Sequence, residues 1–238
     1  MTDFAAADRY LEAHLDASLD ELTRLARIPS IAAQGTGIEE CAELVAGMLR
    51  RRGFEVVIHS TAGSPVVTAE RAGRSDRTLM VYNHYDVQPA EPLELWTSPP
   101  FEPARRDGKF FGRGVSDDKG HLTSRLLALD ALLDQGGELP CRIKCVVEGE
   151  EEVGSRHLPE FLREHRERLR ADACLWEFGS VDHREVPVLY AGLRGLTYVE
   201  LSVESAAVDA HSGIGGAILP NAAWRLTWAL AWTSRPDG

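Results

Sequence analysis

The stretch TLMVYNHYDV at residues 78–87 carries the strongest indication of the fold. It begins as a β-rich apolar run typical of a buried strand and ends in polar side chains, among them His84 and Asp86. Similar runs occur elsewhere along the chain: EVVIHS (55–60), PVVTAE (65–70), CRIKCVVEGEEE (141–152) and ACLWEF (173–178). We therefore expect a sheet of several short strands.

Helical segments are expected around and between these runs. In residues 5–27 leucines recur at spacings of three and four, and the pattern ends at Ile28–Pro29. Residues 38–52 form a second predicted helix, and two more lie at 119–133 and 159–170. Strands that alternate with helices predict an α/β fold, in which a mostly parallel sheet is flanked by helices.

The pattern of the sequence changes around the segment GLRG at residues 192–195. A long β-rich run, LTYVELSVES (196–205), follows directly, and a helix is expected to begin near Asn221. We place a domain boundary here, so that residues 1–191 form one domain and residues 192–238 begin a second.

Composition argues against several classes of function. The net charge of −11 disfavours nucleic acid as a partner, because phosphate binding needs a basic face. No apolar run approaches the roughly 20 residues that span a membrane, and the N-terminus lacks the apolar core of a secretory signal. The four cysteines are interpreted as reduced thiols, so we expect a cytoplasmic protein with no membrane partner.

Polar residues gather where the apolar runs end, and in a parallel α/β sheet ligands bind at the carboxyl ends of strands. His84 and Asp86 are two residues apart, so they face the same side of a strand. A metal-binding histidine often shares its second ring nitrogen with a carboxylate. The alternative is a strand-end histidine beside a solvated aspartate.

A second group lies in GRGVSDDKG at residues 112–120. Asp117 and Asp118 stand between glycines just before a predicted helix. One of them could cap that helix, and this could hold for Asp118 while Asp117 faces a metal.

Further carboxylates follow the last two runs. The string EGEEEVGS (148–155) is an acidic cluster, and such crowding favours a nearby cation, although a solvated turn explains it equally well. Glu177 ends ACLWEF. A histidine with several carboxylates suits zinc, manganese or cobalt. A two-metal site needs a shared carboxylate and a further carboxylate as general base.

These motifs together resemble the M20 family of metallopeptidases, and most closely its dipeptidase and carnosinase-like branch. The matching strings share the order and spacing of the family and cover essentially the whole chain: HYDVQP (84–89), LWTSPPFEP (95–103), GRGVSDDKG, EGEEEVGS, GLRGLTYVEL (192–201) and DAHSGIGGAILPN (209–221). The resemblance implies a zinc-peptidase-like catalytic domain over residues 1–191. The start of an α+β lid or dimerisation domain would follow it.

The resemblance also implies a role for each site residue. His84 would bind one metal, with Asp86 orienting it and Glu177 completing that metal's ligands. Asp117 would bridge both metals, and Glu152 would bind the second.

Two further residues would act in catalysis. Glu151 would be the general base. His211, in the lid, would contact the substrate, often across a dimer interface. The cofactor would be two Zn²⁺ ions, with Mn²⁺ or Co²⁺ possible, and the protein would form a homodimer through the lid.

The resemblance implies hydrolysis of a small peptide, or alternatively of an N-acyl amino acid. The family's last metal-binding histidine lies farther along the chain than residue 238, so we expect both domains here to be incomplete. A non-catalytic fragment that lacks this histidine is a further alternative. His121 and His157 are the residues that could replace it.

Overall fold

The computed structural model describes residues 4–233. The chain divides into two compact units, Met1–Tyr190 and Ala191–Gly238. This division lies close to the expected boundary near residue 192. The assignment of the units to a catalytic domain and a lid remains a prediction.

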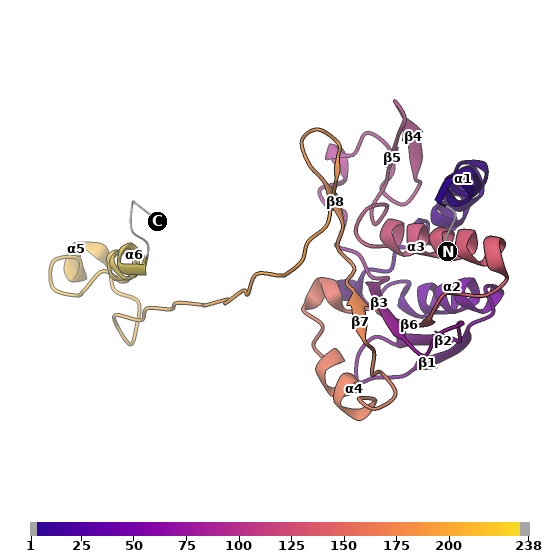
Figure 1. Ribbon diagram of the computed structural model, residues 1–238. Coiled ribbons are helices and arrows are strands. Elements are labelled where there is room, and N and C mark those ends of the chain that lie inside the picture. The colour runs from indigo at the N-terminus through magenta and orange to yellow at the C-terminus, as the bar shows by residue number, and fades with distance from the viewer. Residues whose placement is uncertain (1–3, 234–238) are drawn as a thin grey trace. The chain divides into compact units, whose positions relative to one another are not determined.

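The first unit is built on a five-stranded sheet with the order β1-β2-β6-β3-β7 (Figure 1). β2 runs antiparallel to both β1 and β6, whereas β3 runs parallel to both β6 and β7. Only β2 therefore opposes the other strands, and the predicted α/β fold with a mostly parallel sheet is confirmed. The strands are β1 Glu55–His59, β2 Val66–Arg71, β3 Thr78–His84, β6 Arg142–Glu148 and β7 Ala173–Leu175.

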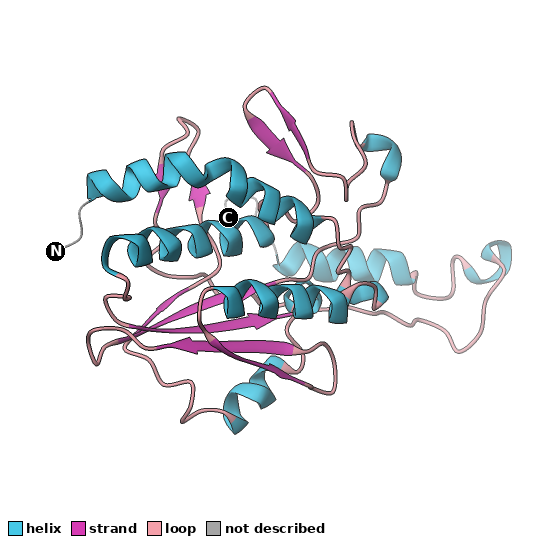
Figure 2. Ribbon diagram, turned by 90° about the vertical axis from the view of Figure 1, so that its right-hand side faces the viewer, coloured by secondary structure: helices cyan, strands magenta, loops and turns pink. Residues whose placement is uncertain are grey.

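Helices cover both faces of this sheet (Figure 2). Side chains alternate along a strand, so Val81 faces the cluster formed with α1, α2 and α3, while Tyr82 faces the cluster under α4. Leu25, Leu49 and Leu126 bring the three long helices onto the first face. The helices are α1 Phe4–Ala26, α2 Ile38–Arg51, α3 Lys119–Gly136 and α4 Leu158–Glu164.

An ionic cluster joins the three helices of the first face. Arg52, at the end of α2, donates to both carboxylate oxygens of Glu21 in α1 and to both oxygens of Asp130 in α3. The guanidinium and the Glu21 carboxylate are largely buried. Their planar, charge-assisted hydrogen bonds fix how the helices cross above the sheet.

The connections carry short elements of their own. Helix α3 links the parallel strands β3 and β6, which brings the carboxyl ends of both strands to one edge. The remaining elements of the first unit are η1 Ala32–Gln34, η2 Leu93–Leu95, η3 Glu151–Val153, and the hairpins β4 Ala104–Arg106 with β5 Lys109–Phe111 and β8 Ser180–Val181 with β9 Pro187–Val188.

Some expected elements end earlier than the sequence pattern indicates. The helix expected over 159–170 stops at Glu164, and the strand expected over 173–178 stops at Leu175. The run at 141–152 is a strand up to Glu148 that passes into an acidic turn, as expected. Helix α4 packs on the sheet through Leu158 and Phe161. The segment that follows the helix is rich in charged residues, and its Leu169 packs against the same hydrophobic cluster.

The second unit contains α5 Ser212–Gly215 and α6 Ala222–Thr233. The helix expected near Asn221 is present, but the strand expected over 196–205 is wrong, because that segment has no regular structure. A strand needs a neighbour to pair its backbone groups, and no described residue of 191–233 supplies one. Within residues 4–233, no helix combines the length and apolar character needed to cross a membrane.

Candidate metal centre

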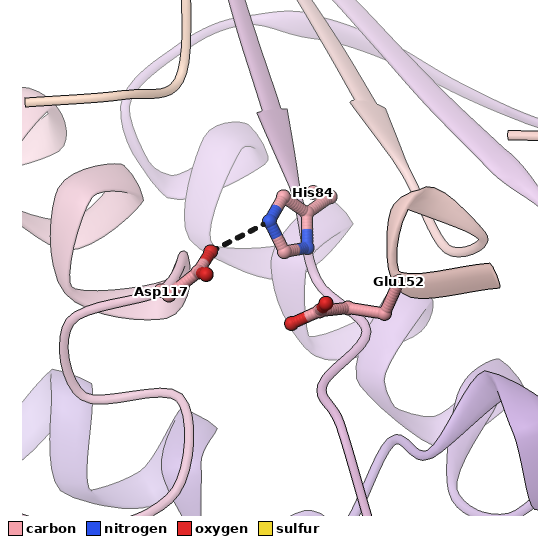
Figure 3. A group of neighbouring side chains, drawn as sticks. All are labelled: His84, Asp117 and Glu152. Atoms are coloured by element: carbon pink, nitrogen blue, oxygen red, sulfur yellow. Dashed lines mark hydrogen bonds and ion pairs between the residues drawn. The ribbon is translucent and has the colours of Figure 1, made fainter. Parts of the chain in front are cut away.

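His84 is the last residue of β3, and its side chain is fully buried. Its Nε2 atom lies 3.0 Å from Oδ1 of Asp117, which comes from the loop before α3. Figure 3 shows that the side chains of His84, Asp117 and Glu152 point toward one another. The Asp117 carboxylate is 72% exposed, so an ion could reach this group from solvent.

Asp86 faces the other side of the imidazole. Its Oδ1 atom is 3.3 Å from Nδ1 of His84, and its backbone oxygen is 3.1 Å from the same nitrogen. The buried Asp86 carboxylate also accepts hydrogen bonds from the backbone amides of Glu151 (3.2 Å) and Glu152 (3.0 Å). Asp86 therefore fixes the imidazole and the glutamate turn relative to each other.

The three consecutive glutamates after β6 separate into two groups. Glu150 turns away from His84, since its carboxylate accepts from the amide of Ser64 and contacts Nδ1 of His157 at 2.9 Å. Glu151 turns toward the histidine, with 4.0 Å between its Oε2 and Nε2 of His84.

Glu152 reaches the same group and is held there by Gln88, whose Nε2 donates to its Oε2 at 2.9 Å. One ligand atom from each of His84, Asp117 and Glu152 lies within 4.8 Å of the others.

Glu177 approaches from the segment after β7. Its Oε2 atom is 3.9 Å from Nε2 of His84 and is buried without a hydrogen-bond partner among the described residues. A buried carboxylate oxygen without a partner is costly, and a bound cation would satisfy it. His84, Asp118 and Glu177 form a second group whose ligand atoms lie within 4.8 Å of one another.

Asp118 occupies the N-cap position of α3, but its side chain makes no capping hydrogen bond, so the capping interpretation is wrong. Its buried Oδ2 instead accepts from Nδ2 of Asn83 at 2.6 Å and from the amide of His84 at 2.9 Å. Its Oδ1 lies 3.0 Å from Nδ1 of His121. Asp118 thus ties the start of α3 to the end of β3.

The charged side chains of the site shift one another's pKa values. Burial alone would lower the pKa of His84, but hydrogen bonds to Asp117 and Asp86 outweigh it and raise the pKa to about 11. The hydrogen bond to His84 in turn lowers the pKa of Asp117.

The pKa values of three glutamates of the site are shifted in the opposite direction. Burial, followed by the charges of Glu151 and the aspartates, raises the pKa of Glu177 to about 7. Burial and neighbouring carboxylates also raise the pKa values of Glu151 and Glu152. Several carboxylates thus share one imidazole, and this donor set fits a divalent cation.

Some residues that shape the site were missed by the sequence interpretation. Asn83 directly precedes the string HYDVQP (84–89) and Gln88 lies within it, and their polar side chains near His84 in the sequence were the only signal. Gly149 passes so close to Tyr85 that a Cβ atom would lie 2.3 Å from the tyrosine hydroxyl, which explains why a glycine interrupts the glutamates. Arg125 in α3 donates to Oδ1 of Asn83, and nothing in the sequence pattern indicated this contact.

The other candidate histidines lie elsewhere. His121 and His157 are engaged with Asp118 and Glu150 and belong to neither ligand group. His211 lies in the second unit, where it precedes α5 and its Nδ1 accepts a 3.0 Å hydrogen bond from the amide of Gly213.

Comparisons with known proteins point to one family. The model for peptidase family M20/M25/M40 matches residues 80–228. The Cys-Gly metallodipeptidase dug1 of Schizosaccharomyces pombe is 31% identical over an alignment of 246 residues that covers 94% of this chain and 52% of that protein. The β-Ala-His dipeptidase of Homo sapiens is 32% identical over 166 residues, covering 65% of this chain and 31% of that protein.

A solved structure is similar over nearly the whole chain. An M20 family metallo-carboxypeptidase, Sso-CP2 from Sulfolobus solfataricus, superimposes with a TM-score of 0.85 and 34% identity, over 93% of this chain and 50% of that one. The chain therefore spans about half the length, or less, of the relatives it matches.

Proposed function

This chain belongs to peptidase family M20/M25/M40, and we propose that it hydrolyses the peptide bond of dipeptides or short peptides with the help of two divalent cations. One observation carries the proposal. His84, Asp117, Glu151, Glu152 and Glu177 converge at the carboxyl edge of β3, β6 and β7, where α/β proteins bind their ligands.

The ligand assignment is the one that the family resemblance implies. His84 and Glu177 would hold one ion, Glu152 would hold the other, and Asp117 would bridge them. Zinc is the ion proposed, with Mn²⁺ or Co²⁺ as alternatives, because imidazole and carboxylate ligands suit all three. Oε2 of Glu177 has no hydrogen-bond partner within the described part of the chain, and this supports the presence of a cation on its side of the histidine.

The two cations would polarise the scissile carbonyl and lower the pKa of the attacking water from about 15.7 towards about 7. Glu151 would accept the proton from that water and pass it to the leaving amine. Burial raises the pKa of Glu151, which favours a carboxylate able to hold a proton between the two steps. Asp86 would keep the imidazole of His84 in the tautomer that leaves Nε2 free for a metal.

The role of the second unit is also a proposal. His211 would contact the substrate from a lid domain, and a homodimer would form through that lid. The free cysteines Cys41, Cys141, Cys145 and Cys174 support a reducing, cytoplasmic location.

A substrate panel with controlled metal content tests the proposal. Dipeptides and N-acyl amino acids would be offered to the chelator-treated protein, before and after zinc or manganese is restored. Metal-dependent release of amino acids from dipeptides is expected. Cleavage of N-acyl amino acids alone would identify a deacylase instead, and metal-independent cleavage would refute the proposed mechanism.

A further inference from the structure

We propose that Arg125 is a positioning residue that holds the carboxyl ends of β3 and β7 together and so keeps Glu177 beside His84. The inference rests on the proposed function in one respect, since it takes Glu177 as part of the metal centre. Arg125 donates its hydrogen bonds to Asn83 and to two backbone carbonyls, and its charge interacts with Asp118 and Glu177 of the second ligand group. Its guanidinium acts on the backbone that carries them.

Arg125 connects β3 and the segment after β7 just beyond the point where the backbone pairing of β3 with β7 ends. The β3–β7 ladder ends at the pair Val81 and Leu175. At the next residue of each strand, Nη1 of Arg125 donates to the carbonyl oxygen of Tyr82 at 2.8 Å, and Nη2 donates to the carbonyl oxygen of Trp176. One planar cation thus bridges two adjacent strands.

The same guanidinium reaches the backbone of His84 through side chains. Nη1 of Arg125 also donates to Oδ1 of Asn83 at 2.8 Å. Asn83 donates to Oδ2 of Asp118, which accepts from the amide of His84 at 2.9 Å. A continuous path of hydrogen bonds therefore runs from the segment before Glu177 to His84.

The segment that carries Glu177 has little else to hold it. β7 has only three residues, all exposed, and among the described residues it pairs with β3 alone. On the other face of the sheet the rings of Tyr82 and Trp176 stack with 3.9 Å between their centroids. Arg125 joins the same two residues, Tyr82 and Trp176, through their backbone carbonyls. Glu177 directly follows Trp176, so a shift of Trp176 would move the Glu177 carboxylate, which is a proposed metal ligand.

A lysine could not replace this arginine. The fork of a guanidinium offers donors in one plane to several acceptors at once, whereas an ammonium is a single point on a flexible stem. Removal of both donors would leave two carbonyl oxygens and the Asn83 amide oxygen without their charged partner. The effect should be local to β7, because β2, β6 and β3 keep their ladders.

The test compares Arg125→Met and Arg125→Lys with Arg77→Gln. Arg77 is a matched control, since its Nη1 lies 3.3 Å from Oδ1 of Asp172 and links the amino ends of the same two strands. Hydrogen–deuterium exchange of residues 173–179 and zinc affinity by calorimetry are measured on the 238-residue chain. Both Arg125 variants should exchange about tenfold faster in that segment and bind zinc about tenfold more weakly, while exchange in β2 and β6 stays unchanged.

Unchanged exchange in residues 173–179, or an equal effect of Arg77→Gln, would overturn the role of Arg125. Should Arg125→Met lose its circular dichroism spectrum, Arg125→Lys decides by the same readouts. If the wild-type chain binds no zinc, the proposed function fails, yet the exchange measurement still decides whether Arg125 holds β7.

Discussion

Oδ2 of Asp86 accepts a 3.0 Å hydrogen bond from the backbone amide of Glu152. Through Oδ1, the same carboxylate lies 3.3 Å from Nδ1 of His84. One buried aspartate thus sets the distance between the histidine at the end of β3 and the glutamates after β6. The geometry of the candidate centre depends on this residue as well as on the proposed ligands.

Asp86→Asn should therefore weaken metal binding although Asp86 is not itself a proposed ligand. The amide can neither accept from both backbone amides nor orient the imidazole as a carboxylate does. Loss of such an outer partner typically lowers metal affinity about 10–100-fold. Zinc calorimetry checks this, with the exposed Asp134→Asn in α3 as control. Wild-type affinity in Asp86→Asn would show that the carboxylate does not orient His84.

Substitution of Glu151 should affect turnover, whereas substitution of Glu152 should affect metal binding. Glu151→Gln should retain metal and lose about 10²–10⁴-fold in turnover, because an amide cannot accept a proton from water. Glu152→Gln should lose affinity for one metal. Glu150→Gln is the matched control, since Glu150 contacts His157 and Ser64 instead. Elemental analysis and dipeptide hydrolysis separate the cases, and the reverse pattern would exchange the two assignments.

His211→Ala should lower turnover far more than metal content, because the proposed role is contact with substrate. The exposed His183→Ala serves as control. Mixtures of His211→Ala with Glu151→Gln should regain activity if the histidine acts across a dimer. Turnover equal to the wild type in His211→Ala would remove the residue from the proposed site.

Glu21 should give the fold a pH-dependent stability. Burial alone would raise its pKa, but hydrogen bonds and charges from Arg52 and Arg51 outweigh this and lower the pKa. The stabilisation is therefore present above the ordinary glutamate pKa and is lost as the pH falls through the lowered native value. Glu21→Gln should reduce the free energy of unfolding by about 1–3 kcal/mol at pH 7.

This deficit should shrink as the solution is acidified below the ordinary glutamate pKa, because protonation of Glu21 removes the charge that glutamine also lacks. Urea denaturation at pH 7 and at about pH 3 measures it. The exposed Glu12→Gln in α1 is the control. An equal deficit at both pH values would show that the ion pair does not stabilise the helices.

The sheet and the main features of the site could be predicted because they depend on local pattern. Apolar runs marked β3 and β6, and polar residues at their ends marked His84 and the glutamates. Parallel strands bring such ends to one edge, so proximity followed from topology alone.

Other features depend on contacts between distant segments, which no local pattern encodes. Arg125 looks like an ordinary helix residue, yet it bonds to carbonyls 43 and 51 residues away in the sequence. Asp118 has a good capping position but bonds to β3 instead. The β-rich run at residues 196–205 predicted a strand, but a β-rich run supplies no pairing partner.

The most direct test of the metal centre is a zinc titration in buffers of different ionisation enthalpy. Hydrogen bonds to Asp117 and Asp86 raise the pKa of His84 and so favour its protonated form, whereas a metal ligand must be unprotonated; zinc binding should therefore displace a proton. The account predicts zinc binding with proton release in the wild type, and strongly weakened binding in His84→Ala and Asp117→Ala. Absence of zinc binding, or binding that is unaffected by either substitution, would contradict it.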